Sequence, residues 1–212
     1  MQSKKTNKFY KVFDDIISKT DSDRMVKEIY NPEFPFYIQM ETSEYPSKLR
    51  NSVIANKNTY DTHGLVHVVH DTSRGINSFL HETFSNIVEK FCKDHDLEFE
   101  KHIRMKINLV FQKTGYEDKY HYPHIDTPER HYVLLYYIND SDGPTWLFNN
   151  KYDGENHSDT LETAAKIEPK QGRAVLFDGR YFHASTNPAK HDYRAVINFN
   201  FTTKKEIDFS IL

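Results

Sequence analysis

One short stretch of this sequence combines a histidine and a carboxylate at a spacing that suits metal binding. His124 and Asp126 stand two residues apart in Tyr-Pro-His-Ile-Asp at 122–126. On an extended strand such side chains leave the same face, so the imidazole and the carboxylate would converge. They would supply two ligands of a 2-His-1-carboxylate triad, which leaves positions open on a non-haem ferrous ion. In a chain with 12 histidines the same pair also arises by chance, as an exposed His and Asp in a polar loop.

Further elements follow the pair in an order that supports the metal interpretation. An apolar strand at 174–177 ends in the turn Asp178-Gly179, His183 comes directly afterwards, and a last strand begins near Arg194. With these elements the sequence resembles the Fe(II)/2-oxoglutarate-dependent dioxygenases, and within them the prolyl-4-hydroxylase-like group. The resemblance covers about residues 103–203. Its most specific parts are Leu-Tyr-Tyr-Ile-Asn-Asp at 135–140 and Pro-Lys-Gln-Gly at 169–172.

The resemblance implies a metal site with catalytic ligands. His124, Asp126 and His183 would bind Fe(II), leaving positions for 2-oxoglutarate and O2, with ascorbate as a candidate accessory. Members of the family decarboxylate 2-oxoglutarate to succinate and CO2 and oxidise an unactivated C–H bond. Asp126 favours hydroxylation, because halogenating relatives carry a small residue in its place. His121 departs from the group's pattern, and we expect it beside the metal ligands or facing the substrate.

The cosubstrate is expected to bind through one cation and several polar side chains. The far carboxylate of 2-oxoglutarate requires a fixed positive charge in a mostly apolar pocket. Arg194 suits this role, since a guanidinium binds a carboxylate through two hydrogen bonds and stays charged; the alternative is an ordinary surface Arg. The resemblance places the hydroxyl of Tyr137 on the same carboxylate and Asn108 in the cosubstrate site. Asn198 and Asn200 share the strand face of Arg194, and we choose Asn198 as the fourth cosubstrate-binding residue.

Short apolar strands separated by turn residues fill the second half of the chain. Two-residue alternation predicts a strand at 104–112, and further strands are predicted at 133–138, 145–148, 174–177 and 194–201. The pattern favours a mainly β fold with flanking helices, and the resemblance implies a double-stranded β-helix (jelly-roll) core with the metal in its open mouth. We expect a single domain over 1–212, with a support region of helices and strands at 1–102 and the jelly-roll catalytic core at 103–203.

The first half is predicted to supply supporting helices. Apolar residues within 8–19 fit either a short strand entering a helix or one amphipathic helix, and Asp21 or Ser22 could cap a helix over 23–30. Helical spacing over 76–92 predicts the main helix on the outside of the sheet, with a cap among residues 71–73 and Cys92 as a core thiol.

Two histidines in this half offer a competing metal pair. His67 and His70 lie in a strand predicted at 65–70, where the two-residue period would place them on opposite faces. We therefore expect them to belong to the scaffold.

Composition limits the partners. The net charge is −3 and the pI near 6.5, which argues against a surface devoted to the nucleic-acid backbone. A lone cysteine excludes an intrachain disulfide, and no apolar run is long enough for a membrane span or a signal peptide, so a cytoplasmic location is expected. Nothing in the sequence indicates an oligomeric state.

The leading hypothesis is hydroxylation of a peptidyl residue, with proline as the family guess, or of a free amino acid. The partner would then be a peptide, a protein or an amino acid. One alternative is a nucleic-acid demethylase of the repair-dioxygenase type, although the second Arg of that group is replaced by Asn200. Another is a non-catalytic ligand-binding β-sandwich. Specificity is expected in the loops at 41–63, 113–123 and 149–165.

Overall fold

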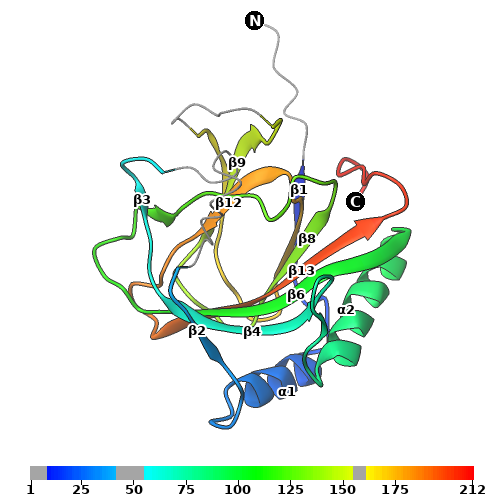
Figure 1. Cartoon of the computed structure of the whole chain (residues 1–212), viewed down its shortest axis with the longest axis horizontal. Helices are drawn as coiled ribbons and strands as arrows, with labels where there is room; N and C mark the ends of the chain where they lie inside the picture. Colours follow the sequence, from blue (N-terminus) through cyan, green and yellow to red (C-terminus); the bar gives the residue numbers. More distant parts are fainter. Residues whose placement is uncertain (1–8, 42–54, 155–160) are drawn as a thin grey trace, which may run out of the picture.

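Two antiparallel β-sheets face each other in the computed structural model, which describes residues 9–41, 55–154 and 161–212 (Figure 1). The large sheet has the order β1-β11-β8-β13-β6-β4-β2, with β5 paired to β4. Its strands are β1 (Tyr10–Phe13), β11 (Ala174–Asp178), β8 (Tyr132–Tyr137), β13 (Tyr193–Thr203), β6 (Phe99–Phe111), β4 (Gly64–Asp71), β2 (Tyr37–Gln39) and β5 (Gly75–Ile76). The small sheet consists of β10 (Thr163–Ile167), β9 (Thr145–Lys151) and β12 (Tyr181–Ser185). A short parallel pair joins β3 (Thr59–Tyr60) to β7 (Tyr120–His121).

Helices cover the outer face of the large sheet. α1 (Lys19–Ile29) and α2 (His81–Asp94) lie together on that side in Figure 1. Phe84 and Val88 of α2 are fully buried against a core that includes Met105 of β6 and Phe199 of β13. No helix in the described part of the chain combines the length and the apolar character that a membrane crossing demands.

The central strands are buried on both faces, which explains their continuous apolar runs. In β8, Leu134 and Tyr136 belong to the core under the helices, whereas Val133, Leu135 and Tyr137 belong to the core between the sheets. The small sheet adds a third cluster around Trp146 and Phe182. The architecture confirms the predicted mainly β fold with flanking helices and a jelly-roll core. The division at residue 102 stays a prediction.

The helix starts differ from the sequence predictions. Within the predicted segment 8–19, the described residues 9–19 contain strand β1 and the start of α1. α1 begins before Asp21 because the Ser18 hydroxyl accepts a hydrogen bond from the Asp21 backbone N–H at 3.1 Å. α2 begins only at His81, since residues 75–76 pair with β4 as β5, and its N-cap, Leu80, has no side-chain cap bond. The predicted caps of both helices were therefore wrong.

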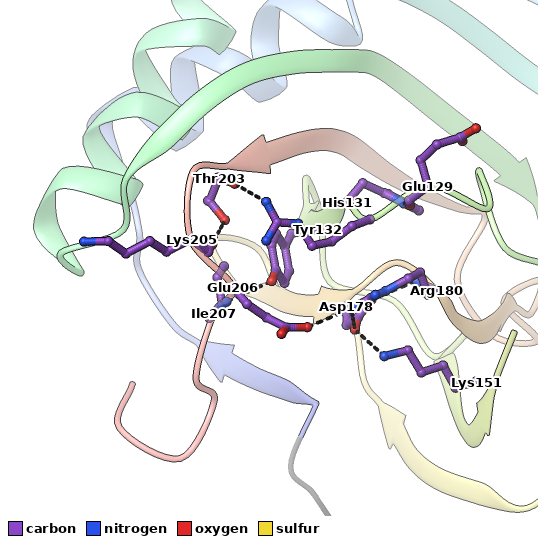
Figure 2. A network of polar contacts seen from close by, with 11 residues as sticks. Glu129, His131, Tyr132, Lys151, Asp178, Arg180, Thr203, Lys205, Glu206 and Ile207 are labelled. Atoms are coloured by element: carbon purple, nitrogen blue, oxygen red, sulfur yellow. Dashed lines mark hydrogen bonds and ion pairs between the residues drawn. The ribbon is translucent and has the colours of Figure 1, made fainter. Parts of the chain in front are cut away.

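A polar network fastens the chain after β13 to the neighbouring strands (Figure 2). Arg180 donates hydrogen bonds to Asp178 at 2.7 and 2.9 Å and to Glu206 at 3.0 Å. The Ile207 N–H donates to the hydroxyl of Tyr132 at 2.8 Å. These bonds join the end of the chain to β8 and to the turn after β11.

Candidate metal centre

The structure brings His124, Asp126 and His183 together between the two sheets. His124 precedes β8 and forms a two-way backbone pair with His183 of β12, with both N···O distances 3.0 Å. The ligand atoms of the three side chains all lie within 4.8 Å of one another. His183 Nε2 is 3.9 Å from Asp126 Oδ2, and the two imidazole centroids are 4.7 Å apart. Among the described residues, no other group of three or more His, Cys, Asp or Glu side chains has its ligand atoms this close together.

Backbone carbonyls orient both imidazoles. His124 Nδ1 lies 3.0 Å from the carbonyl oxygen of Tyr122, and His183 Nδ1 lies 3.2 Å from that of Tyr181. Rings protonated on Nδ1 donate to these carbonyls and keep the Nε2 lone pair for a metal. Burial lowers the pKa of His124, and burial together with the neighbouring His124 lowers the pKa of His183 to about 4. Both rings are therefore neutral at neutral pH, as metal ligands must be.

Two residues that sequence reasoning did not assign to the metal site hold the carboxylate. Arg104 of β6 donates to Asp126 Oδ1, and Asn200 of β13 donates to Asp126 Oδ2 at 2.6 Å. Burial alone would raise the pKa of Asp126, but chiefly the charge of Arg104 holds that pKa well below its usual range. The two-residue alternation of β6 places Arg104 on the polar face of this strand. That alternation was the sequence signal that could have identified Arg104 as a candidate site residue.

Arg194 is a buried cation without an anion. It is 3% exposed, its Nη2 donates to Thr145 Oγ1 at 2.7 Å, and its Nε has no hydrogen-bond partner within residues 9–41, 55–154 and 161–212. In the part of the chain that the structure describes, no carboxylate lies within 4.0 Å of its guanidinium. The hydroxyl of Tyr137 donates to the same Thr145 Oγ1 at 2.7 Å. Because a buried unpaired charge is costly, this arrangement fits an anionic ligand.

A cavity of about 80 Å³ connects these groups. Asn108 of β6 and Asn198 of the neighbouring strand β13 line it. In the described part of the chain, the buried Asn198 Oδ1 has no hydrogen-bond partner. The wall also includes His124, Asp126, His183, Arg104, Lys106, Gln39, Thr145, Ser185 and Arg194. Tyr137 is fully buried behind Thr145 and is not part of the wall.

The ring nitrogens of His121 form hydrogen bonds with side chains other than the three candidate metal ligands. Its Nδ1 lies 2.7 Å from Ser185 Oγ and its Nε2 lies 2.7 Å from Asn187 Oδ1. The Tyr60 hydroxyl donates to the same Asn187 oxygen at 3.0 Å. Burial lowers the pKa of His121 to about 4. His121 thus belongs to a buried hydrogen-bond network that reaches the cavity through Ser185.

Comparisons with known proteins agree with this geometry. Residues 110–202 match the model of the 2OG-Fe(II) oxygenase superfamily. A comparison with curated proteins found no match.

Several solved structures share the fold. A Trichoplax adhaerens prolyl hydroxylase, in complex with a hypoxia inducible factor oxygen degradation domain peptide fragment, is 19% identical. The similarity covers 92% of this chain and 84% of that one, with a TM-score of 0.54. A 2OG-Fe(II) oxygenase family oxidoreductase from Burkholderia pseudomallei is 11% identical over 94% and 87% of the chains, with a TM-score of 0.61. The alpha ketoglutarate dependent epimerase SnoN from nogalamycin biosynthesis is 8% identical over 92% and 79%, with a TM-score of 0.60.

Proposed function

We propose that the chain hydroxylates a C–H bond of a peptidyl residue or of a free amino acid, and the match of residues 110–202 to the 2OG-Fe(II) oxygenase superfamily supports an oxygenase activity. Proline is the first candidate, and 2-oxoglutarate would be converted to succinate and CO2. One observation carries this proposal. A His-Asp-His group and a buried, unpaired guanidinium open into the same cavity.

The donor set fits a ferrous ion. Two neutral imidazoles and a carboxylate suit Fe(II) and leave coordination positions open, so His124, Asp126 and His183 would hold it. Bound there with 2-oxoglutarate and O2, the ion would supply the oxidation of an unactivated C–H bond. Arg104 and Asn200 each bind one oxygen of Asp126, so the carboxylate stays ionised and keeps one orientation.

The cosubstrate would lie between the metal ligands and Arg194. The guanidinium of Arg194 would bind the far carboxylate, using the Nε that lacks a partner among the described residues. Tyr137 would act by fixing Thr145, since its hydroxyl donates to Thr145 Oγ1. Asn108 and Asn198 would contribute polar contacts from the cavity wall.

An exposed strand edge beside the cavity favours a peptide substrate. β2 is the last strand of the large sheet, and its Gln39 lines the cavity. Tyr37, Ile38 and Met40 around it are 67%, 73% and 77% exposed. A peptide could add to such an edge as a further strand and place one side chain near the metal. The peptide complex of the Trichoplax prolyl hydroxylase supports the same class of substrate.

Turnover assays test this proposal. Purified protein with Fe(II) and 2-oxoglutarate, with and without ascorbate, should release succinate, whereas His183→Ala should not. A panel of proline-containing peptides, free amino acids and methylated oligonucleotides should then identify the substrate, with mass spectrometry detecting the gain of one oxygen atom. Oligonucleotide demethylation without peptide oxidation would establish the repair-type alternative. Binding of 2-oxoglutarate with no succinate under any condition would establish the non-catalytic sandwich.

A further inference from the structure

A second group of histidines lies between α2 and the large sheet. His70 comes from β4, His81 is the first residue of α2, and His102 comes from β6. The ring centroids of His70 and His81 are 5.3 Å apart, and each is 6.5 Å from that of His102. Glu89 of α2 places its Oε1 3.8 Å from His102 Nε2. This group belongs to the helix-covered face of the sheet, whereas the metal centre opens on the other face.

Register shifts in the sheet bring two of these histidines to the helix side. A shift just before His70 pairs it with Met105, and a second shift pairs His102 with Phe201. Met105 and Phe201 both belong to the core under the helices. Strict alternation predicted opposite faces for His67 and His70, and the shift makes that prediction wrong. Extra residues that redirect a side chain in this way are common next to functional sites.

Polar atoms in this group lack hydrogen-bond partners within the described residues. The His102 side chain is only 11% exposed, and neither of its ring nitrogens has a partner. His70 Nδ1 and the hydroxyl of Ser85 are buried without partners as well. His81, Ser85 and Glu89 follow each other at helical spacing on one face of α2. Native proteins rarely leave several neighbouring polar atoms unsatisfied, so a bound ligand would explain the arrangement.

We propose that His70, His81 and His102, together with Glu89, form a binding site for a borderline divalent cation, with Zn²⁺ as the probe. Three imidazoles and a carboxylate are a ligand set that Zn²⁺ accepts. Burial, with the neighbouring histidines, lowers the pKa of His102 to about 4, so its lone pair is free at neutral pH.

The spacing is close to what such an ion needs. Zn–N bonds of about 2.0–2.1 Å in a tetrahedron put imidazole centres about 5 Å apart. The His70–His81 pair at 5.3 Å already meets this spacing. The His102 ring, at 6.5 Å from both, would have to approach by about 1 Å when the ion binds. The bound ion would join the start of α2 to β4 and β6.

Zinc titration of the metal-stripped full chain tests the site. The metal centre is first silenced by Asp126→Ala with His183→Ala. Competition against a chromophoric chelator should then give two Zn²⁺ equivalents for the wild type and one for the silenced chain. Adding His81→Gln or His102→Gln to the silenced chain should abolish binding of the remaining Zn²⁺ or lower its affinity by more than about 100-fold. A loss of up to about 100-fold is what removal of an outer-sphere partner costs. His191→Gln is the matched control, since His191 is an exposed histidine that contacts Asp142.

Folding is monitored in the same variants. Zn²⁺ should raise the Tm of the silenced chain and of its His191→Gln form, but not of its His81→Gln form; circular dichroism checks that each is folded. His81 starts the helix and is partly exposed, so its change to Gln is well tolerated by the fold.

The outcomes separate this proposal from the proposed function. A silenced chain that binds no Zn²⁺ overturns the second site and leaves the oxygenase centre untouched. The second site is also overturned if the silenced chain still binds one Zn²⁺ equivalent with unchanged affinity after either His81→Gln or His102→Gln is added. If Asp126→Ala with His183→Ala leaves the number of bound Zn²⁺ ions unchanged, the result instead counts against the oxygenase centre.

Discussion

Replacing Arg194 by Met should weaken 2-oxoglutarate binding without weakening the fold. The side chain is 3% exposed and no carboxylate of the described residues neutralises it. Removing one partner of a buried charge pair costs about 2–5 kcal/mol, which corresponds to an affinity loss of at least about 30-fold. The protein without cosubstrate loses one hydrogen bond to Thr145, worth about 1 kcal/mol, but is relieved of an unpaired buried cation. Its Tm should therefore be unchanged or higher.

Thermal unfolding with and without 2-oxoglutarate, under anaerobic conditions with Fe(II), separates these effects. Cosubstrate at 100 times its Kd stabilises the wild type by about 2.7 kcal/mol, which is about 5–10 °C in a chain of this size. At the same cosubstrate concentration, an affinity loss of about 30-fold leaves only about 0.9 kcal/mol of this stabilisation. Arg194→Met should therefore keep at most about a third of the shift, and its KM for 2-oxoglutarate should rise at least about 30-fold. Arg173→Met is the control, because Arg173 pairs with Asp14 at 2.7 Å outside the cavity and should keep the full shift. An Arg194→Met protein that keeps the wild-type shift would show that Arg194 does not bind the cosubstrate.

The remaining predictions address the carboxylate, a buried histidine and the C-terminal network. Asn200→Ala should weaken Fe(II) binding about 10- to 100-fold in an anaerobic titration, because Asp126 loses an orienting bond, and an unchanged affinity would count against that role. The folded pKa of His121, about 4, lies below its unfolded value, so stability should fall as pH drops from about 6.5 to about 4, by at most about 1.4 kcal/mol per pH unit. Urea unfolding of His121→Gln should show a correspondingly flatter pH dependence, and an equal slope would contradict this. Asp178→Asn should cost about 1–3 kcal/mol in the same assay, since Arg180 loses a charged partner, and a smaller loss would argue against the network.

Most strands, and the grouping of the three candidate ligands, could be predicted from the sequence. Alternation over 104–109 and the buried run at 133–137 reflect side-chain burial directly. The alternation fails at the end of β6, where Val110 is buried and Phe111 is exposed. The convergence of His124 and Asp126 with His183 followed from the order of the motifs, and the structure brings these side chains together.

Other features depend on pairing that no short stretch of sequence records. The contact between Arg104 and Asp126 requires β6 to lie opposite the loop before β8, so alternation could give the face of Arg104 but not its partner. The register shift before His70 reversed the face that alternation assigned to it. The start of α2 moved to His81 because the preceding residues pair with β4, an interaction stronger than their helical spacing.

The most direct test of the central claim is an anaerobic titration of the metal-stripped protein with Fe(II) in the presence of 2-oxoglutarate, followed by visible absorption. We expect a charge-transfer band that saturates at one equivalent of Fe(II), persists in His191→Gln, and is absent from a folded His183→Ala protein. A wild-type protein that shows no band, or a His183→Ala protein that shows the full one, would contradict the assignment of His124, Asp126 and His183 as the ligands of one ferrous ion.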